Sequence, residues 1–342
     1  MHSLSKLNQE FVARGWNRKP TGRLLAEFSL HVTLALGGAA VVVLSRSLLI
    51  DALGMLVSTM GSLGISTNAH TSSHYATSNR RWVNRALTYF GYPFLLGMSA
   101  TYWWHKHVAV HHPTPNVIGL DDDVDLLPVF TVNERDLAEA RGLRRWWFEH
   151  QWRVIPFAIA FNALNVQIAG VRYLSGCLRD PARRTASHVY DLLMLLGHTA
   201  VWLVIPALLF GPLPVLAFTA VRMALLGYAI FIAFAPAHFP AKAVFLDQEG
   251  KGRAEYFRKA DFILLQTATT LNFRTGMLGR LFCAGVDYQI EHHLFPGFSH
   301  VYYPRMSRIL KRFCEENGYP YRTLGWGEAV WKSLVAFRRL KP

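Results

Sequence analysis

Long apolar runs alternate with polar, basic stretches along this chain. The first run, FSLHVTLALGGAAVVVLSRSLLI at 28–50, is separated from the second, ALGMLVSTMGSLGISTNA at 52–69, only by Asp51. A second pair of runs, at 188–210 and 213–237, is divided only by a Gly-Pro dipeptide. About 20 apolar residues in a helix cross the hydrocarbon core of a bilayer. The pattern therefore predicts four transmembrane helices in two tight hairpins.

Two weaker apolar segments and one buried charge complicate this pattern. The segment at 87–104 is broken by Pro93, and the segment at 153–170 has Pro156 near its start. Either segment could be a further span, but because proline interrupts a helix we favour a location at the membrane interface for both. Arg222 lies near the middle of the fourth run, so we expect it to face a polar partner inside the bundle.

The distribution of charge orients the predicted spans. The chain has 342 residues, with 36 Lys and Arg against 22 Asp and Glu, and the two hairpin loops carry almost none of the basic residues. Basic flanks favour the cytoplasmic side, so the lead at 1–27, the stretch 70–187 and the tail after 238 are expected there. The sequence predicts an all-α integral membrane protein, a single domain over 1–342, with a cytoplasmic helical cap.

The basic surplus narrows the classes of partner. A net charge of +14 suits anionic lipid, an acidic protein or an anionic substrate, and the many apolar runs argue against nucleic acid. Cys177, Cys283 and Cys314 lie far apart without a Cys-x-x-Cys pair. This spacing argues against both a disulfide framework and a thiolate metal site.

Eight of the 15 histidines form groups at the predicted cytoplasmic edge. They are His70 and His74, then His107, His111 and His112, then His238, and finally His292 and His293. Residues at i and i+4 share one face of a helix, and neutral imidazole is a good ligand for iron, zinc, copper or nickel. Surface histidines beside headgroups would explain one such pair but not three clusters and a singleton on one side. The number of nitrogens suits two ions, with positions left open for oxygen or water.

Three stretches carry a family resemblance. HTSSH, YWWHKHVAVHHPTPN and GVDYQIEHHLFP resemble the three histidine boxes of the membrane fatty acid desaturases, over about residues 65–320. The glutamine that opens the third box is similar to that of front-end acyl desaturases, which insert a double bond between an existing one and the carboxyl end. The resemblance implies a cis double bond formed in a fatty acyl chain, two non-haem irons, dioxygen as co-substrate and electrons from a separate carrier.

The resemblance also implies roles for individual residues. The iron ligands would be His70, His74, His107, His111, His112, His238, His292 and His293. Gln289 stands where other desaturases have a further histidine, and it would ligate iron through its amide oxygen, hydrogen-bond a ligand or line the acyl tunnel. Thr71 and Phe234 depart from the family pattern, because Asp and Asn, respectively, are common at these positions.

Further candidates lie beside the boxes. Groups that could accept a hydrogen bond from a ligand imidazole are Asn116, Asp121, Asp123, Asp287 and Glu291. Candidates for the wall of an acyl tunnel are Tyr102, Trp103, Trp104 and Phe295, although an aromatic belt or simple core packing explains them equally well. Both sets are expectations from sequence proximity.

The electron donor and the substrate are expected from the same resemblance. The His-Pro-Gly-Gly signature of a fused cytochrome b-type domain does not occur in the sequence. We therefore expect a separate donor, a ferredoxin or a cytochrome b-type protein with its reductase, and a bacterial inner-membrane location. The acyl group could be linked to a lipid, to coenzyme A or to a carrier.

Three other functions compete with a desaturase. The first is an acyl or lipid hydroxylase on the same di-iron scaffold, which no motif here separates from a desaturase. A membrane haem or electron-transfer subunit would place paired histidines within spans, where only His31 and His198 lie. A zinc-dependent membrane hydrolase usually has a His-Glu-x-x-His motif, which this sequence lacks.

Overall fold

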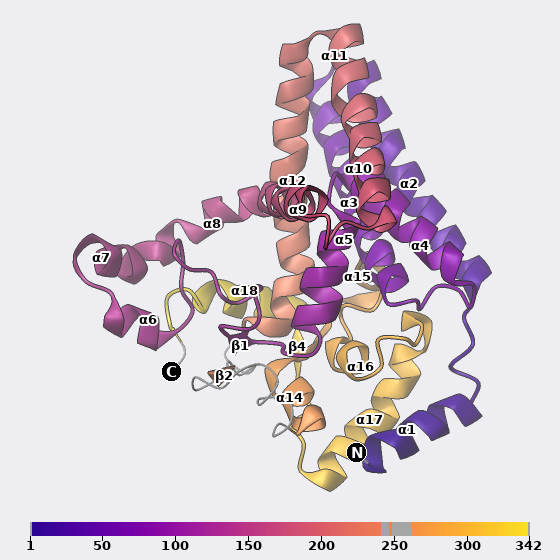
Figure 1. The fold of residues 1–342 in the computed structure, drawn as a ribbon, viewed down its shortest axis with the longest axis vertical. Coiled ribbons are helices and arrows are strands. Elements are labelled where there is room, and N and C mark those ends of the chain that lie inside the picture. The colour runs from indigo at the N-terminus through magenta and orange to yellow at the C-terminus, as the bar shows by residue number, and fades with distance from the viewer. Residues whose placement is uncertain (1, 241–245, 248–260, 341–342) are drawn as a thin grey trace.

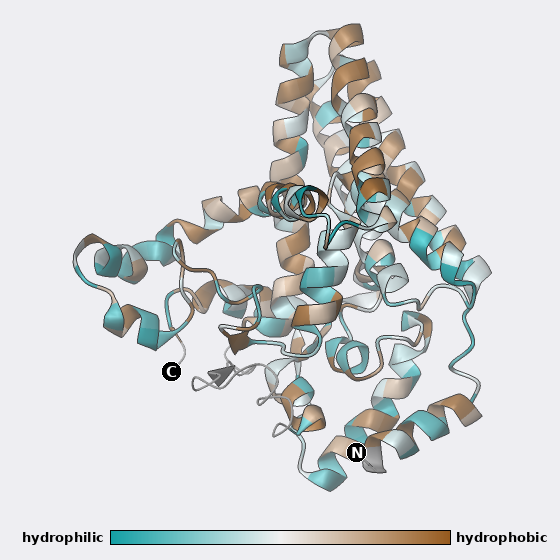
Figure 2. Ribbon diagram, viewed as in Figure 1, coloured by the Kyte–Doolittle hydropathy of each residue, from teal (hydrophilic) through white to brown (hydrophobic). Residues whose placement is uncertain are grey.

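Four long helices stand side by side, and a helical cap lies at one end of them (Figure 1). The structure is a computed structural model that describes residues 2–240, 246–247 and 261–340. The four long segments are α2 (Thr21–Leu44), α3 (Leu48–Ser73), Ala186–Phe210 and α12 (Pro212–His238). Each is long and apolar enough to cross a membrane, which confirms the predicted all-α membrane architecture. Figure 2 shows the apolar residues gathered along these helices.

The remaining elements are mostly short helices. Up to residue 179 they are α1 (His2–Ala13), α4 (Arg81–Tyr89), η1 (Phe90–Leu95), α5 (Ala100–Trp103), η2 (Trp104–His111), β1 (Val117–Ile118), α6 (Glu134–Glu139), α7 (Gly142–His150), η3 (Gln151–Arg153), α8 (Ile155–Ala158), η4 (Ile159–Phe161) and α9 (Asn162–Arg179). The third long segment comprises α10 (Ala186–Thr199), η5 (Ala200–Val204) and α11 (Ile205–Phe210). After α12 come β2 (Leu246–Asp247), α14 (Phe262–Thr269), β3 (Asn272–Arg274), α15 (Gly276–Cys283), α16 (Gln289–Leu294), η6 (His300–Tyr302), α17 (Tyr303–Asn317), β4 (Thr323–Gly325) and α18 (Trp326–Val335).

The first hairpin turns earlier than its hydropathy predicts. The turn lies at 45–47, where the Ser47 amide donates to Ser45 Oγ at 3.0 Å, and not at Asp51. Asp51 instead lies in the first turn of α3, where the helix dipole favours a carboxylate. The prediction was wrong because the turn residues sit inside an apolar run and the acidic residue sits inside a helix.

Small residues let α2 and α3 approach closely. An added Cβ on Gly61 would overlap the backbone of Ala35 and His31, and one on Gly38 would overlap the backbone of α3 at Ser58. Ser58 Oγ also donates to the Ala35 carbonyl across the interface at 2.8 Å. Close backbone approach of this kind is the usual basis of helix association in lipid. It fixes the position of α3, which carries the first two histidines of the cap.

The aromatic segment at 87–104 does not form one continuous helix. It passes through η1, which contains Pro93, and turns at Gly97, whose φ is +68°. Three side chains from other helices bind the carbonyl groups that this break leaves free. The donors are His198 Nδ1 to Phe94 O at 2.9 Å, Arg222 Nη2 to Leu95 O at 3.1 Å and Gln167 Nε2 to Leu96 O at 2.7 Å. Arg222 therefore has the polar partner expected for it, and its guanidinium also lies 4.0 Å from the Trp202 ring centroid.

A bent arm leaves the bundle near the level of the cap. The helices over Gly142–Arg153 and Ile155–Arg179 bend by 73°, and α7 and α8 extend sideways from the bundle in Figure 1. Phe157 and Phe161 on this arm are 71% and 64% exposed. By length and composition the bent pair could count as a fifth span. Its predicted place at the membrane interface stays a prediction.

The cap is built around apolar clusters and two short parallel strand pairs. β1 pairs with β2, and β3 pairs with β4. One cluster joins α1, α16 and α17 through Phe11, Ile290, Phe295 and Met306. The three cysteines are buried and unbridged. The apolar cluster of α1, α16 and α17 holds α16, which carries the last pair of histidines, against α17.

Candidate metal centre

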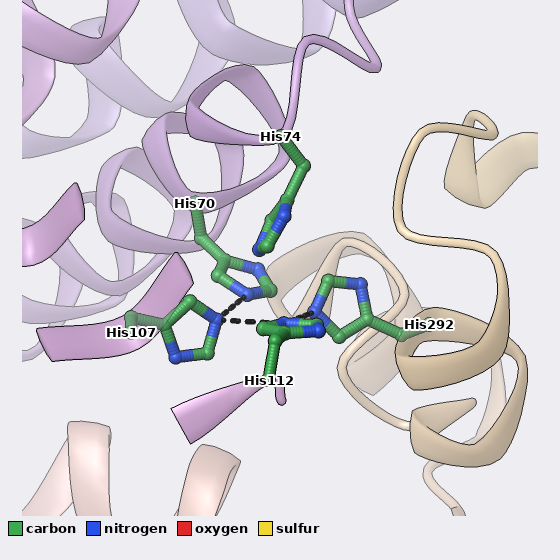
Figure 3. Close-up of side chains that lie close together, drawn as sticks. All are labelled: His70, His74, His107, His112 and His292. Atoms are coloured by element: carbon green, nitrogen blue, oxygen red, sulfur yellow. Dashed lines mark hydrogen bonds between the residues drawn. The ribbon is translucent and has the colours of Figure 1, made fainter. Parts of the chain in front are cut away.

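All eight predicted histidines converge in the cap, and their side chains form two groups. The first group is His70, His74, His107, His112 and His292, whose imidazoles face one another in Figure 3. The second group is His111, His238 and His293. Within each group the nearest ring nitrogens all lie within 4.8 Å of one another. The eight side chains are buried, so the set is shielded from bulk water.

The end of α3 supplies the first pair of histidines. His70 lies in the last turn of α3 and His74 follows its end, so their rings lie on one face with centroids 5.1 Å apart. Trp103 packs edge-on to His70 at 5.9 Å, and its indole Nε1 donates to Ser73 Oγ at 3.2 Å. Phe234, the departure from the family pattern, packs edge-on to His70 at 5.7 Å. These aromatic contacts restrict the orientation of the His70 ring.

The second histidine cluster lies on a π-helix, which the sequence did not predict. In η2 the amide of His112 donates to the His107 carbonyl at 3.0 Å, an i to i+5 bond that widens the turn. His107 consequently has two neighbours, with ring centroids 5.2 Å away at His111 and 4.7 Å away at His112. His107 and His112 join the first group, whereas His111 joins the second. One segment thus contributes to both groups, and the π-helical turn places His112 rather than His111 with His107.

His292 and His293 belong to different groups because successive residues of a helix point in different directions. The rings of His292 and His293 are nearly perpendicular, at 88°. His292 Nε2 lies 2.9 Å from His112 Nε2, and His293 stacks on the His112 ring at 4.3 Å. His112 therefore lies at the boundary between the two groups.

Two polar residues accept hydrogen bonds from imidazoles of the second group. His111 Nδ1 donates to Asp121 Oδ2 at 2.9 Å, which directs His111 Nε2 into the second group. His293 Nδ1 donates to Gln266 Oε1 at 2.8 Å, and Gln266 Nε2 donates to the His112 carbonyl at 2.9 Å. Asp121 is thus the predicted acidic residue that accepts from one of the eight histidines, and its role behind a metal ligand stays a prediction. Gln266 was missed, and the available signal was a single amide in the apolar stretch FILLQTATT.

Asp123 and Asn116 support the same group less directly. Asp123 Oδ2 lies 3.4 Å from His111 Nδ1, and Asp123 Oδ1 pairs with Lys106 Nζ at 2.7 Å. Asn116 Nδ2 donates to the His238 carbonyl at 2.9 Å rather than to its imidazole. Its backbone amide donates to Asp121 Oδ2 at 2.8 Å. Asn116 therefore positions both the end of α12 and the carboxylate that holds His111.

Asp287 and Glu291 face away from the histidines, contrary to expectation. Glu291 accepts from Tyr321 Oη at 2.6 Å and from Asn272 Nδ2 at 2.8 Å. Asp287 accepts from Thr275 Oγ1 at 3.1 Å. Neither carboxylate contacts a ligand imidazole in the part of the chain that the structure describes. Successive helical residues point in different directions, so proximity in sequence misled the prediction. The Glu291 network instead anchors α16 to β3 and to the loop before β4.

Burial sets the charge of most of the histidines. It lowers the pKa of His107, His112 and His292 well below the ordinary value, and that of His74 to about 3. Such imidazoles are neutral, which is the form that binds a metal. At His111 burial acts in the same direction, but the carboxylates of Asp121 and Asp123 together outweigh it and raise the pKa.

The donor set fits metal ions. The Nε2 atoms of His70 and His107 lie 2.8 Å apart, and His112 Nε2 lies near His107 Nε2 at 3.2 Å. Each neutral imidazole has one N–H, so these converging nitrogens cannot all satisfy one another. His74 Nε2 is buried without a hydrogen-bond partner among the described residues. Nitrogen-rich, sulfur-free sites of this kind suit iron or another first-row transition metal.

Gln289 lies at the second group. Its Nε2 lies 2.9 Å from His238 Nε2 and 3.2 Å from His293 Nε2, and its Oε1 is buried without a partner among the described residues. The amide therefore reaches the place where a further ligand would stand. Its ligation of a metal stays a prediction.

The four candidate tunnel residues occupy different places. Trp103 stacks on the His107 ring at 4.6 Å, and Trp104 Nε1 donates to the Ser73 carbonyl at 3.1 Å. Tyr102 packs against Tyr173 at 5.6 Å. Phe295 contacts Phe11 at 5.0 Å, within the cap cluster. A role in an acyl tunnel stays a prediction for all four.

Comparison with known proteins decides the family. A family model described as fatty acid desaturase matches residues 47–325, a region that contains all eight histidines. The chain belongs to the fatty acid desaturase family. The predicted desaturase enzyme is confirmed at the level of this family. The same match disfavours the haem subunit and the zinc hydrolase as alternatives.

Curated desaturases resemble the chain at low identity. The sn-1 linoleoyl-lipid 6-desaturase of Synechocystis is 28% identical over 280 residues, which are 79% of this chain and 74% of that protein. The Delta(8)-fatty-acid desaturase of Euglena gracilis is 29% identical over 328 residues, covering 93% of this chain and 73% of its own length. A Delta(5) fatty acid desaturase of Caenorhabditis elegans is 27% identical over 79% of this chain but only 59% of that protein. The chain thus spans part of the length of these relatives, whose names specify different double-bond positions.

Proposed function

We propose that this desaturase inserts a cis double bond into a fatty acyl chain at a front-end position, using two histidine-bound irons and dioxygen. The observation that carries the proposal is the division of eight buried imidazoles into two adjacent groups that share η2. The relatives named as a linoleoyl-lipid 6-desaturase and a Delta(8)-fatty-acid desaturase support the choice of reaction. The acyl group would be linked to a lipid or to coenzyme A.

The reaction requires electrons from outside the substrate. Converting a CH2–CH2 unit into a CH=CH unit breaks two C–H bonds and supplies two electrons and two protons. Reduction of dioxygen to two waters takes four electrons and four protons. A separate one-electron carrier must therefore deliver the other two electrons, and water must supply the other two protons. The bound irons would provide the oxidising power that an unactivated C–H bond requires.

The chain's own residues would hold and orient this chemistry. Asp121 and Gln266 each accept from an Nδ1 and so keep the Nε2 atoms of His111 and His293 directed at the second group. Burial keeps the other rings neutral and excludes bulk water, which protects a strong oxidant from side reactions. The spans would keep the acyl chain in the membrane beside the cap.

The topology and location are part of the same proposal. Basic residues are concentrated in the lead, the middle stretch and the tail, and the cap lies at one end of the four spans. Both termini and the histidine groups would then face the cytoplasm, at a bacterial inner membrane. The separate donor would reach the cap from the aqueous side.

Lipid analysis of a host that expresses the chain tests the proposal. Feeding deuterated fatty acids should give products that have lost two hydrogens, with the double bond located by mass spectrometry. His293→Ala should abolish the product, while His150→Ala, which lies outside both groups, should retain it. Purified protein should contain about two irons per chain. A product that gains one oxygen would instead establish a hydroxylase and overturn the desaturase proposal.

A further inference from the structure

Arginine side chains line a groove formed by residues of α1 and α17 and the segment that follows α1. Figure 1 shows α1 and α17 at the end of the molecule opposite the tips of the spans. The volume of the groove is about 550 Å³. The charged residues that line it are Arg14, Arg305, Arg308 and Arg312, with Glu10 and Glu316. Glu10 pairs with Arg14 at 2.7 Å. In the part of the chain that the structure describes, the three α17 arginines form no ion pair, so the groove retains an excess of positive charge.

The periodicity of α17 produces this surface. Arg305, Arg308 and Arg312 follow at i, i+3 and i+7, which places their guanidinium groups along one face of the helix. The opposite face buries Met306 and Leu310 in the cap cluster. The basic face is therefore held rigidly by packing on the other side of the same helix. No hydrogen bond within the described chain requires these arginines.

Aromatic side chains connect the groove with the third histidine pair. Trp16 lines the groove and packs against Phe11 at 5.5 Å, and Phe11 packs against Phe295 at 5.0 Å. Phe295 follows His293 by two residues in the chain. Along a second route, Tyr303 at the start of α17 lies inside the cap, with its Oη 3.4 Å from His292 Nδ1. A series of packed aromatic side chains therefore leads from the groove to the segment that carries His292 and His293.

The position of the groove restricts what can occupy it. The apolar helices extend away from the cap, whereas α1 and α17 lie at its far side (Figures 1 and 2). A flat bilayer around the spans would not reach this face, so a soluble anionic partner fits it better than a lipid headgroup. Because electron transfer slows steeply with distance, a donor must also approach the metal centre closely.

We propose that the groove between α1 and α17 docks an acidic, one-electron redox protein that reduces the histidine-bound metal centre. The inference rests on the proposed function, which requires two electrons per double bond. Each docking event would transfer one electron from the carrier to the metal centre. Two reduced carriers would therefore be oxidised for each double bond formed. Complementary charge would speed their encounter and make it sensitive to salt.

Reversing single charges on α17 tests docking of the electron donor without changing any residue of the two histidine groups. Arg308→Glu reverses a charge that lines the groove, whereas Lys311→Glu makes a matched reversal at an exposed position of the same helix that does not line it. The probe is reduced [2Fe–2S] ferredoxin with an acidic surface. At low ionic strength Arg308→Glu should raise the KM for ferredoxin about five- to tenfold, and Lys311→Glu should change it by less than about twofold. The difference should shrink as salt shortens the screening length from about 30 Å at 0.01 M to about 10 Å at 0.1 M.

A second measurement removes the donor from the assay. Protein reduced anaerobically with dithionite and then mixed with oxygen should form the same single-turnover product in Arg308→Glu as in the original chain. Equal ferredoxin KM values in the two variants would overturn the docking proposal. Loss of single-turnover product in Arg308→Glu would also overturn it, because the groove would then serve the substrate or the fold. Loss of binding to phosphatidylglycerol vesicles, with the ferredoxin KM unchanged, would assign the groove to lipid instead.

Failure of the proposed function would give a different result. In that case the original chain yields no desaturated product even in the single-turnover reaction. Docking is then tested by calorimetric titration with oxidised ferredoxin, which requires no turnover. Binding that weakens about five- to tenfold in Arg308→Glu but not in Lys311→Glu would still support the site, and equal binding by both variants would refute it.

Discussion

Replacing Asp121 by Asn should weaken one metal position more than the other. The carboxylate is 1% exposed and accepts three hydrogen bonds. Oδ2 accepts from His111 Nδ1 at 2.9 Å and from the Asn116 amide at 2.8 Å, and Oδ1 accepts from the Asp123 amide at 3.0 Å. Asparagine has the same shape but only one oxygen. Its NH2 group must therefore face at least one of these three donors.

The magnitude follows from the loss of the carboxylate behind His111 and from the donor that the NH2 group then faces. A buried donor left without an acceptor costs about 1–3 kcal/mol. Loss of a carboxylate behind a ligand histidine commonly lowers metal affinity about 10- to 100-fold, equivalent to about 1.4–2.7 kcal/mol, which is the same range. His111 belongs to the second group, with His238 and His293. The first group loses no hydrogen bond, so its affinity should change little.

The assay is an anaerobic titration with chelator-buffered ferrous iron, followed by metal analysis of the protein. For Asp121→Asn one of two binding midpoints should move about 10- to 100-fold to higher free iron. Asp122→Asn makes the same chemical change at the neighbouring exposed position and should leave both midpoints in place. Unchanged midpoints in Asp121→Asn, or equal movement of both, would refute the assignment of Asp121 to one group.

Other substitutions test the supports of the centre. Gln266→Ala removes the acceptor of His293 Nδ1, so it should raise the same midpoint by about 10-fold, while Gln266→Glu, which keeps an acceptor oxygen, should recover part of the affinity. Tyr321→Phe leaves a buried carboxylate without its shortest hydrogen bond and should lower stability by about 1–3 kcal/mol, measured as a lower thermal midpoint in detergent. Gly61→Ala forces a Cβ into the backbone of α2 and should destabilise the protein by about 1–3 kcal/mol in the same assay, whereas Gly37→Ala, which meets open space, should not.

Hydropathy identified the four spans because the thickness of a membrane requires a minimum number of consecutive apolar residues, and such a run is visible in the sequence alone. It did not locate the first turn. Ser45 and Ser47 form that turn within an apolar run, and Asp51 is stabilised at a helix start. Hydropathy averaged over a window reports whether residues prefer lipid or water. It does not show which backbone amides bind a side-chain oxygen, as the Ser47 amide does at this turn.

The convergence of the eight histidines was predictable in part for a similar reason. The i, i+4 spacing of His70 and His74 indicated a shared helix face without any knowledge of the fold, whereas the same spacing of His107 and His111 did not, because η2 is a π-helix. The supporting residues depend on contacts across the chain. Gln266 reaches His293 from another helix, whereas Glu291, two positions before that histidine, turns towards Tyr321. Which residue supports His293 therefore depends on how α14 and the segment around Tyr321 pack against α16, and the local sequence does not show this.

The wide turn of η2 has a consequence for how the two groups can move. His107 and His112 belong to one group and His111 to the other, and all three are fixed on a single stretch of backbone. A displacement of this stretch would move histidines of both groups together. The separation between the two groups therefore depends in part on the wide turn of η2, which an ordinary α-helical turn would change.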